Sequence, residues 1–217
     1  MIVAKTILDR AYLLLEDEAH DVWTTAELLQ WLNDAVTSVV NHRPDAYIKR
    51  AIVDLQEGTY QTLPEDAMML VRVTRNLSTH SSITGVPLDI MDDQNPSWRM
   101  PVLANVVQHY LYSDKDPKHF EVFPSVAEGV QIELDYGAMP PEVSLETHTI
   151  PLGKEYVNIL VDWVLYRAWS KDDEAADLNK ATLHFQAFSQ ALGIKSQMQQ
   201  AIIPDTKNAV GVQGASS

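Results

Sequence analysis

The stretch YVNILVDWVLYRAW, residues 156–169, is the most apolar long segment of this 217-residue chain. Its apolar side chains recur at helical spacing on more than one side, and a helix that is apolar nearly all round must be surrounded by other elements. The polar corner SKDD at 170–173 separates it from a second helical pattern, which ends at Gly193, a common helix stop. We therefore predict a helical hairpin over residues 154–192 whose first helix lies at the centre of a bundle.

The N-terminal residues supply two further predicted helices. The first spans residues 2–16, where five apolar residues share one face: Ile7, Leu8, Ala11, Leu14 and Leu15. The second begins with Thr24 and Glu27, which have capping-box spacing. Pro44 ends it, because the residue before a proline avoids helical geometry. In the C-terminal hairpin, the second helix carries a narrower stripe of apolar residues: Leu178, Ala181, Phe185, Phe188 and Leu192.

Between these helical segments the period of the apolar residues changes from helical to alternating. The clearest strand is VQIELDY at 130–136, with every second residue apolar. A turn at Gly58 leads to residues 60–63, a possible partner of the strand at 51–55, and a polar turn at 113–117 joins a second hairpin. We predict an α+β fold: a helical bundle domain from residues 1–44 and 151–199, an inserted antiparallel β-rich region at 45–150, and an extended C-terminal arm at 200–217.

Charge and composition exclude several classes of function. The chain has 30 Asp and Glu against 16 Lys and Arg, a formal net charge of −14, which argues against non-specific nucleic-acid binding and against docking on anionic lipid. It has no cysteine, so disulfides and thiol nucleophiles are excluded. The apolar run at 156–169 is too short to span a bilayer, and the charged N-terminus does not resemble a signal peptide. We expect no membrane association.

Motifs for catalysis or metal binding are weak. The chain has no phosphate-binding glycine loop or nucleophile elbow, and its seven histidines form no helical metal-binding pair. Asp89, Asp92 and Asp93 could bind a cation or perform acid–base chemistry, but they lack the spacing of a known calcium loop, and a surface loop is the favoured interpretation. We therefore expect no catalytic residue, no metal and no cofactor.

Three stretches share their order and spacing with one known family. The first joins Trp23 and ELLQWLNDA at 27–35 to RPDA at 43–46. The second is FEVFP at 120–124, followed by the strand at 130–136 and Pro140. The third is LYRAWSKD at 165–172, followed by Ala181 and Phe188. Over residues 5–193 the chain thus resembles the head-to-tail adaptor (connector) proteins of tailed bacteriophages, the type with a β-rich insertion.

This resemblance implies a structural virion protein of the phage neck, assembled in the host cytoplasm. Such a protein forms a ring, typically dodecameric, that joins the portal ring to tail or nozzle proteins and lets double-stranded genomic DNA pass through its centre during ejection. No member of this kind is an enzyme. The acidic net charge suits a lumen that repels DNA, and ring closure requires contacts between two different faces of each subunit.

The resemblance also directs attention to charged residues between subunits and to the C-terminal arm. Asp162 and Arg167 lie on a buried helix, so each needs a partner; an internal salt bridge is the default and a subunit contact is the alternative. The other candidates for the subunit interface are Lys171, Asp172, Trp98 and Arg99. Trp98 can instead anchor a loop to the sheet. The candidate portal-docking residues of the arm are Ile202, Ile203, Pro204, Val210 and Val212.

Two other functions remain open from the sequence. One is a carboxylate- or metal-dependent hydrolase that uses Asp89, Asp92 and Asp93. The other is a stand-alone binding module that dimerises through its helices.

Overall fold

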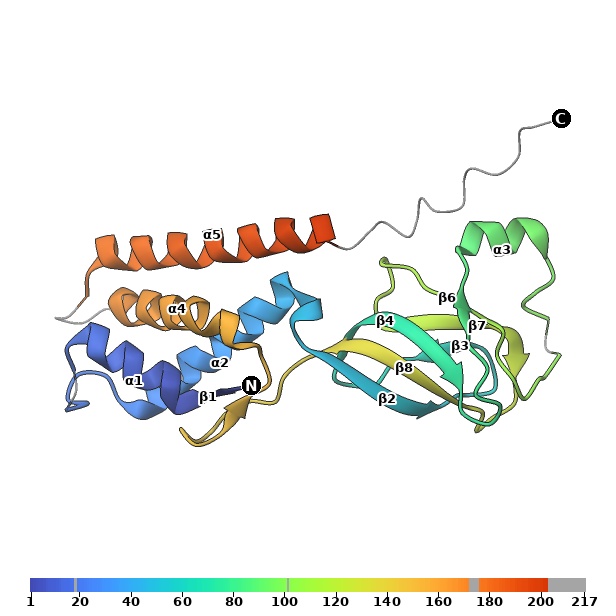
Figure 1. Ribbon diagram of the computed structural model, residues 1–217, viewed down its shortest axis with the longest axis horizontal. Helices are drawn as coiled ribbons and strands as arrows, with labels where there is room; N and C mark the ends of the chain where they lie inside the picture. Colours follow the sequence, from blue (N-terminus) through green and yellow to red (C-terminus); the bar gives the residue numbers. More distant parts are fainter. Residues whose placement is uncertain (18, 101, 172–175, 203–217) are drawn as a thin grey trace, which may run out of the picture. The chain divides into compact units, whose positions relative to one another are not determined.

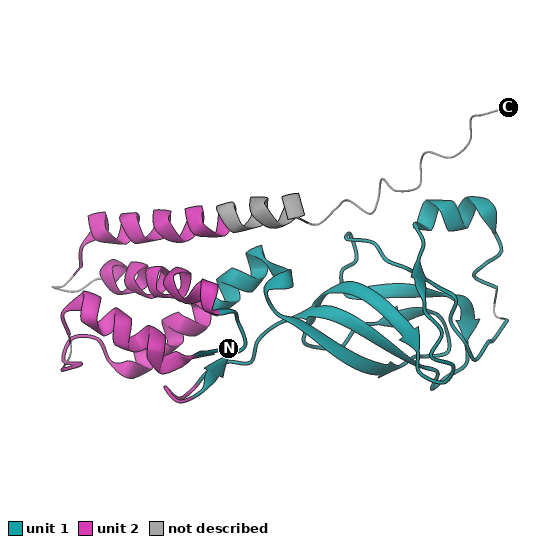
Figure 2. Cartoon of the chain, viewed as in Figure 1, with its two compact units in different colours: residues 1–2, 36–143, 148–153 teal, residues 3–35, 144–147, 154–217 magenta. Residues whose placement is uncertain are grey.

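The computed structural model of the protein describes residues 1–17, 19–100, 102–171 and 176–202, with residues 194–202 as backbone only. The chain forms two compact units, each built from several separate segments (Figure 2). The β-rich unit contains residues 1–2, 36–143 and 148–153, and the helical unit contains residues 3–35, 144–147 and 154–217. The predicted α+β fold class is confirmed.

The helical unit is organised around α4 (Val157–Ser170), which packs against α1 (Ala4–Leu15) and α5 (Leu178–Ile202) and lies between them in Figure 1. A short 3-10 turn, η2 (Lys154–Tyr156), precedes α4. Four α4 side chains are completely inaccessible to solvent: Leu160, Val164, Leu165 and Ala168. The segment at 156–169 is therefore the central helix that its apolar residues predict.

Local sequence signals set the ends of α2 (Thr25–His42). The Glu27 carboxylate accepts hydrogen bonds from the backbone N–H of Thr24 at 3.1 Å and from its hydroxyl at 2.9 Å, and the Thr24 hydroxyl accepts the Glu27 N–H at 3.3 Å. This is the predicted capping box. The helix ends two residues before Pro44, which opens the 3-10 turn η1 (Pro44–Ala46).

The connector between α1 and α2 is held together by a buried carboxylate. Asp17 accepts hydrogen bonds from the backbone N–H groups of Asp21, Val22 and Trp23, at 2.9 to 3.1 Å. Burial alone raises the pKa of Asp17, but these three donors outweigh it and leave the pKa below its usual value. The acidic segment at 16–21 is thus partly structural, because the Asp17 carboxylate accepts hydrogen bonds from three backbone N–H groups of the turn.

Two expectations for the helices were wrong. Gly193 does not end α5, which runs on through residues 194–202; this segment, IKSQMQQAI, has no proline or further glycine, and one glycine in a helix costs only about 1 kcal/mol relative to alanine. The start of the expected arm at 200–202 is therefore helical. The apolar stripe of α5 is also less continuous than expected: Ala181, Phe188 and Leu192 are buried, whereas Leu178 and Phe185 are 73% and 44% exposed.

The β-rich unit consists mainly of two sheets. One has the strand order β2 (Ile48–Asp54), β8 (Gln131–Ala138), β4 (Ala67–Asn76), and all of its pairs are antiparallel. The other has the order β3 (Gly58–Thr62), β7 (His119–Val126), β6 (His109–Leu111), β5 (Thr84–Gly85). A short helix, α3 (Leu88–Gln94), follows β5. A small pair, β1 (Ile2–Val3) with β9 (Thr149–Ile150), completes the strands named in the described chain.

The core of this unit is formed by side chains from both sheets. The buried members include the alternating residues of β8 and the inward residues of β7: Ile132, Leu134, Tyr136, Phe120 and Val122. Two buried amides join the strands to neighbouring loops. The Gln61 side chain bonds the backbone N–H and carbonyl of Gln56, each at 2.8 Å, and Asn76 bonds the N–H and carbonyl of Val107, each at 2.8 Å. The half-buried strand predicted at 130–136 is confirmed.

One strand pairs with a different neighbour from the one that the sequence suggests. The hairpin across the polar turn at 113–117 is confirmed as the β6–β7 pair. However, β3 pairs with β7 and not with β2, although it follows β2 in the chain. The local pattern identifies a strand correctly here but contains no information about which edge it joins.

We expect Trp163→Ala to lower the free energy of unfolding by about 2–4 kcal/mol, because the change removes a large aromatic side chain from the α4–α5 contact. The Trp163 ring lies 4.7 Å from the Phe188 ring and 5.5 Å from the Tyr166 ring, measured between centroids. Urea denaturation measures the change, with Leu183→Ala on the exposed side of α5 as the control. Equal midpoints for the wild type and Trp163→Ala would show that this contact is not part of the core.

Candidate functional site

Asp162 and Arg167, the charged residues of the central helix, both have partners within the chain. Arg167 donates from an Nη atom to an Asp34 oxygen of α2 at 3.2 Å, and Asp162 lies 3.0 Å from His184 of α5, measured between Oδ1 and Nδ1. All four side chains remain partly exposed to solvent. The default expectation of internal pairing is therefore met, and a role of these residues between subunits remains a prediction.

The corner between α4 and α5 is tied back to the start of α2. Lys171 donates from Nζ to Glu27 at 2.9 Å, and this hydrogen bond is the main reason why the pKa of Glu27 lies below its usual value. Asp177 caps α5 by accepting the backbone N–H groups of Asn179 and Lys180. Asp172 lies outside the described residues. Glu27 thus links the capping box of one helix to the corner after another.

Trp98 and Arg99 fasten the loop after α3 to the second sheet. Trp98 is only 2% exposed and donates from Nε1 to Asp92 at 2.8 Å. The Arg99 guanidinium lies 4.2 Å from the centroid of the Trp98 ring and bonds both Asp92 and Glu121. Trp98 therefore anchors the loop, and Arg99 is the more accessible member of the pair.

The acidic stretch at 89–93 belongs to the helix α3 rather than to the expected surface loop. Hydrogen bonds from Trp98 and Arg99 lower the pKa of Asp92 and use its carboxylate as an acceptor. Within the described residues, no group of three or more His, Cys, Asp or Glu side chains is placed to hold a metal ion. Asp92 thus has a clear structural role in the loop.

A row of arginines on the outer face of the β2–β8–β4 sheet was not predicted from the sequence. Arg50 binds Asp135 through two nitrogens, at 2.7 and 3.1 Å, and Arg72 binds the same carboxylate at 2.8 Å from the other side. In the next row, Arg75 binds Glu133 at 3.1 Å. Asp135 is largely buried, whereas the Arg50 and Arg72 side chains are 54% and 56% exposed.

Exposed aliphatic side chains accompany these arginines. Ile48 and Ile52 flank Arg50 on β2 and are about half exposed, and Ile52 lies in register with Glu133. We call this surface the arginine face and define it by Ile48, Arg50, Ile52, Arg72 and Arg75. Arginine is enriched in protein interfaces, and exposed aliphatic side chains beside it make this face a candidate for a protein contact.

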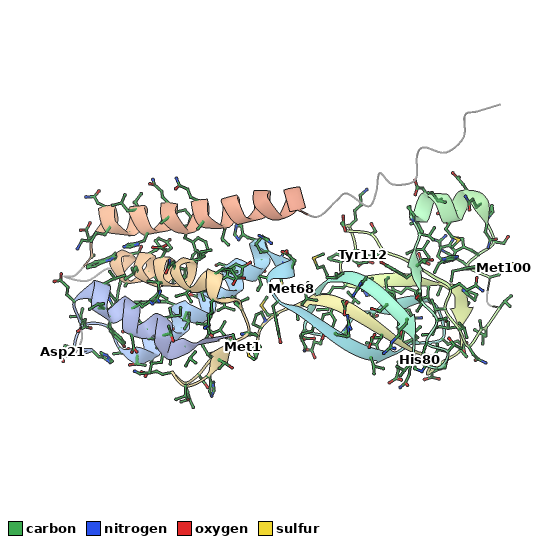
Figure 3. All side chains as sticks on the ribbon, viewed as in Figure 1. Met1, Asp21, Met68, His80, Met100 and Tyr112 are labelled. Atoms are coloured by element: carbon green, nitrogen blue, oxygen red, sulfur yellow. The ribbon has the colours of Figure 1, made fainter. Side chains whose placement is uncertain are left out.

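The β3–β7–β6–β5 sheet carries a groove whose charged lining residues are mainly acidic, in contrast to the arginine face. It has a volume of about 200 Å³ and is lined by aromatic, aliphatic and acidic side chains, among them Tyr60, Leu88, Tyr112, Asp116, His119 and Glu121. Tyr60 stacks on His119 with the ring centroids 4.9 Å apart and donates its hydroxyl proton to Asp116 at 3.1 Å. We call this surface the aromatic groove; Tyr112, which lines it, is labelled in Figure 3.

A separate hollow of about 430 Å³ lies between α1 and α4 in the helical unit. Arg10 donates to the Asn158 side chain across it at 3.1 Å. Leu13 and Leu14 line it and are 63% and 57% exposed. The expectation that Leu14 belongs to the buried face of α1 was wrong, because the buried face follows Ala4, Leu8, Ala11 and Leu15, and Leu14 lies at its edge beside the hollow.

Of the predicted arm residues, only the backbone of Ile202 is described, as the last residue of α5. Ile203, Pro204, Val210 and Val212 lie outside the described residues. A search of the described helices finds none with the length and apolar character that a bilayer crossing requires.

Comparison with known protein families finds a match. A protein-family model described as SU10 adaptor protein matches residues 4–209 and so covers segments of both units. Comparison with curated proteins finds no match to this chain.

We expect Asp135→Asn to destabilise the protein by about 1–3 kcal/mol near neutral pH, because it removes the charge that two guanidinium groups bind. The hydrogen bond from Arg50 is the main cause of a pKa of Asp135 below its usual value. The carboxylate therefore contributes fully above its unfolded-state pKa of about 3.9, and this contribution is lost as the pH falls through the lower folded-state pKa.

Urea denaturation at several pH values checks this expectation. The difference between wild type and Asp135→Asn should be largest near neutral pH and should shrink below about pH 4. Asp93→Asn on the exposed side of α3 is the matched control and should follow the wild type throughout. A difference that stays constant down to the acidic end would contradict the assignment.

Proposed function

This chain belongs to the SU10 adaptor protein family, whose members are phage head-to-tail adaptors, and from that membership we propose that it forms a ring between the portal and the tail. The observation that carries the proposal is the extent of the match, residues 4–209, which includes both the bundle and the β-rich insertion. The role in joining head and tail is structural. The proposed ring is dodecameric, lies in the neck of the virion and is assembled in the host cytoplasm.

The acidic composition supports passage of DNA through the proposed ring without strong binding. A protein that binds duplex DNA neutralises phosphates with Lys and Arg, whereas this chain has a formal net charge of −14. Acidic residues near the channel would repel the phosphate backbone and keep the moving duplex from adhering.

The proposed ring needs contacts between different faces of neighbouring copies. The surroundings of the candidate interface residues differ. These candidates are Asp162, Arg167, Lys171, Asp172, Trp98 and Arg99. Arg167 and Lys171 each hold a carboxylate of α2 while staying partly exposed, so a neighbouring copy can reach both side chains. Trp98 is buried and would act by orienting Arg99, whose side chain is 47% exposed.

The proposed docking of the chain to the portal uses its C-terminal residues. Residues 203–217 contain Ile203, Pro204, Val210 and Val212 among small and polar residues. In the proposed docking, these apolar side chains contact the portal. Because α5 continues to Ile202, the proposed docking segment begins later than residue 200.

Mixing the purified chain with its portal tests the proposed ring. We expect many copies to add to each portal, because the portal ring presents repeated identical sites. Native mass spectrometry or light scattering measures the mass of the complex, and the chain without portal is the control. A stable two-copy species that ignores the portal would instead support a dimeric binding module.

Truncation after Gln200 tests the docking segment. The buried residues of α5, Ala181, Phe188 and Leu192, all precede the cut, so the melting temperature should stay close to that of the wild type. Attachment to portal-bearing heads should be lost. Truncation after Gln213, which keeps all the apolar residues of the segment named above, is the matched control and should still attach. Normal attachment by the shorter chain would contradict a docking role.

A further inference from the structure

We propose that the arginine face of one copy docks on the aromatic groove of the next copy, so that these two surfaces close the ring. This inference rests on the proposed ring and names the surfaces that form its repeated contact.

The two surfaces belong to one compact unit and point in opposite directions. On β2, β8 and β4 the inward residues join the core, and the residues that alternate with them, Arg50 and Ile52 among them, point outward. On β7 the inward residues are Phe120 and Val122, so Glu121 belongs to the outer face of the second sheet, in register with Tyr60. The core lies between these outer faces. Two different surfaces on opposite sides of one unit meet the condition for head-to-tail contacts.

The arginine face is built to receive a protein rather than a nucleic acid. Its three guanidinium groups are held by Asp135 and Glu133, so most of the positive charge that phosphate binding needs is already compensated. The same carboxylates fix the guanidinium planes, which reduces the side-chain entropy lost on docking. Ile48 and Ile52, each about half exposed, add apolar surface on either side of Arg50. Arginine surrounded by aliphatic surface is common at the centre of protein interfaces.

The aromatic groove has the complementary chemistry. The Tyr60 ring is 53% exposed and lies against His119, which leaves an aromatic surface on which a guanidinium group can stack. Asp116 supplies a carboxylate beside it, and the Asp116 side chain is 50% exposed, whereas Arg99 of the same chain already holds Glu121. Leu88 gives the groove an aliphatic wall that fits an isoleucine.

The net charge of the chain favours a second copy as the occupant. Copies with a formal charge of −14 repel one another unless a cationic surface of one meets an anionic surface of the next. The arginine face has three guanidinium groups against two carboxylates, so a small excess of positive charge remains on it, and the groove presents the half-exposed Asp116 carboxylate. Contact between them offsets part of this repulsion.

A charge swap with mixing tests the contact without substituting any residue of the internal ion pairs. Ile52→Glu puts a carboxylate on the arginine face, where it would meet the acidic groove. Leu88→Lys puts an ammonium group in the groove, where it would meet the arginines. Each variant alone should lose portal-bound rings by about tenfold or more relative to the wild type, since like charges would meet at every contact.

An equimolar mixture of the two variants should restore the rings. In an alternating arrangement, the new carboxylate of an Ile52→Glu copy meets the new ammonium group of a Leu88→Lys copy, and the contact after that is wild type on both sides. Native mass spectrometry of the portal complex distinguishes the two chains and gives their ratio, which should be one to one. Val102→Glu, at a residue that is 70% exposed and belongs to neither surface, is the matched control and should assemble normally.

The other outcomes overturn the inference in distinguishable ways. Single variants that assemble like the wild type would show that the two surfaces do not touch. Failure of the mixture, with wild-type rings intact, would show that the surfaces do not face each other. Normal rings of Ile52→Glu with altered DNA release would place the arginine face toward DNA. Failure of the wild type to add several copies to the portal would overturn the proposed function itself.

If either variant has a lower melting temperature than the wild type, Ile48→Glu and Tyr60→Lys form a second pair of variants for the same test.

Discussion

The enclosure of α4 is the constraint on which the helical unit depends. Four of its side chains are completely buried, and the three large ones, Leu160, Val164 and Leu165, each contribute about 1.5–3 kcal/mol only if other helices cover them. The helices that do so come from both ends of the chain: α1 before the β-rich segment and α5 after it. The N-terminal and C-terminal segments must therefore meet, and the long segment between them begins and ends in the same bundle. The order of helices, strands and helices in the sequence follows from this requirement.

Much of this fold could be predicted from local patterns, because each depends on neighbours within a few residues. The apolar run at 156–169, the capping box of Thr24 and Glu27, and the alternation at 130–136 all gave the correct element. The predictions were wrong where contacts between residues far apart in the chain decide the structure. Gly193 lowers helix stability by too little to end α5, and nothing within β3 specifies β7 as its partner. In β4, register shifts place Arg72 and Arg75 on the same outer face although they are three residues apart, so strict alternation fails there.

The candidate surfaces were harder to predict than the fold. Asp162 and Arg167 attracted attention because a charge on a buried helix needs a partner, and each has one. The arginine face gave no such signal. Arg50 and Asp135 are 85 residues apart in the chain, and Asp135 occupies a polar position of an amphipathic strand, where a solvent-facing side chain is the ordinary expectation. Only the pairing of β2 and β4 on either side of β8 shows that this carboxylate is largely buried between two guanidinium groups.

The position of β8 between β2 and β4 also determines when this sheet can form during synthesis. The two outer strands are complete once residue 76 has been translated, yet neither pairs with the other. Both must wait for residues 131–138, which are translated much later. Until then, residues 48–76 leave the ribosome with unpaired strand edges and exposed apolar side chains, a state prone to aggregation. The interval between translation of residue 76 and of residue 138 is therefore when the nascent chain is most prone to aggregation.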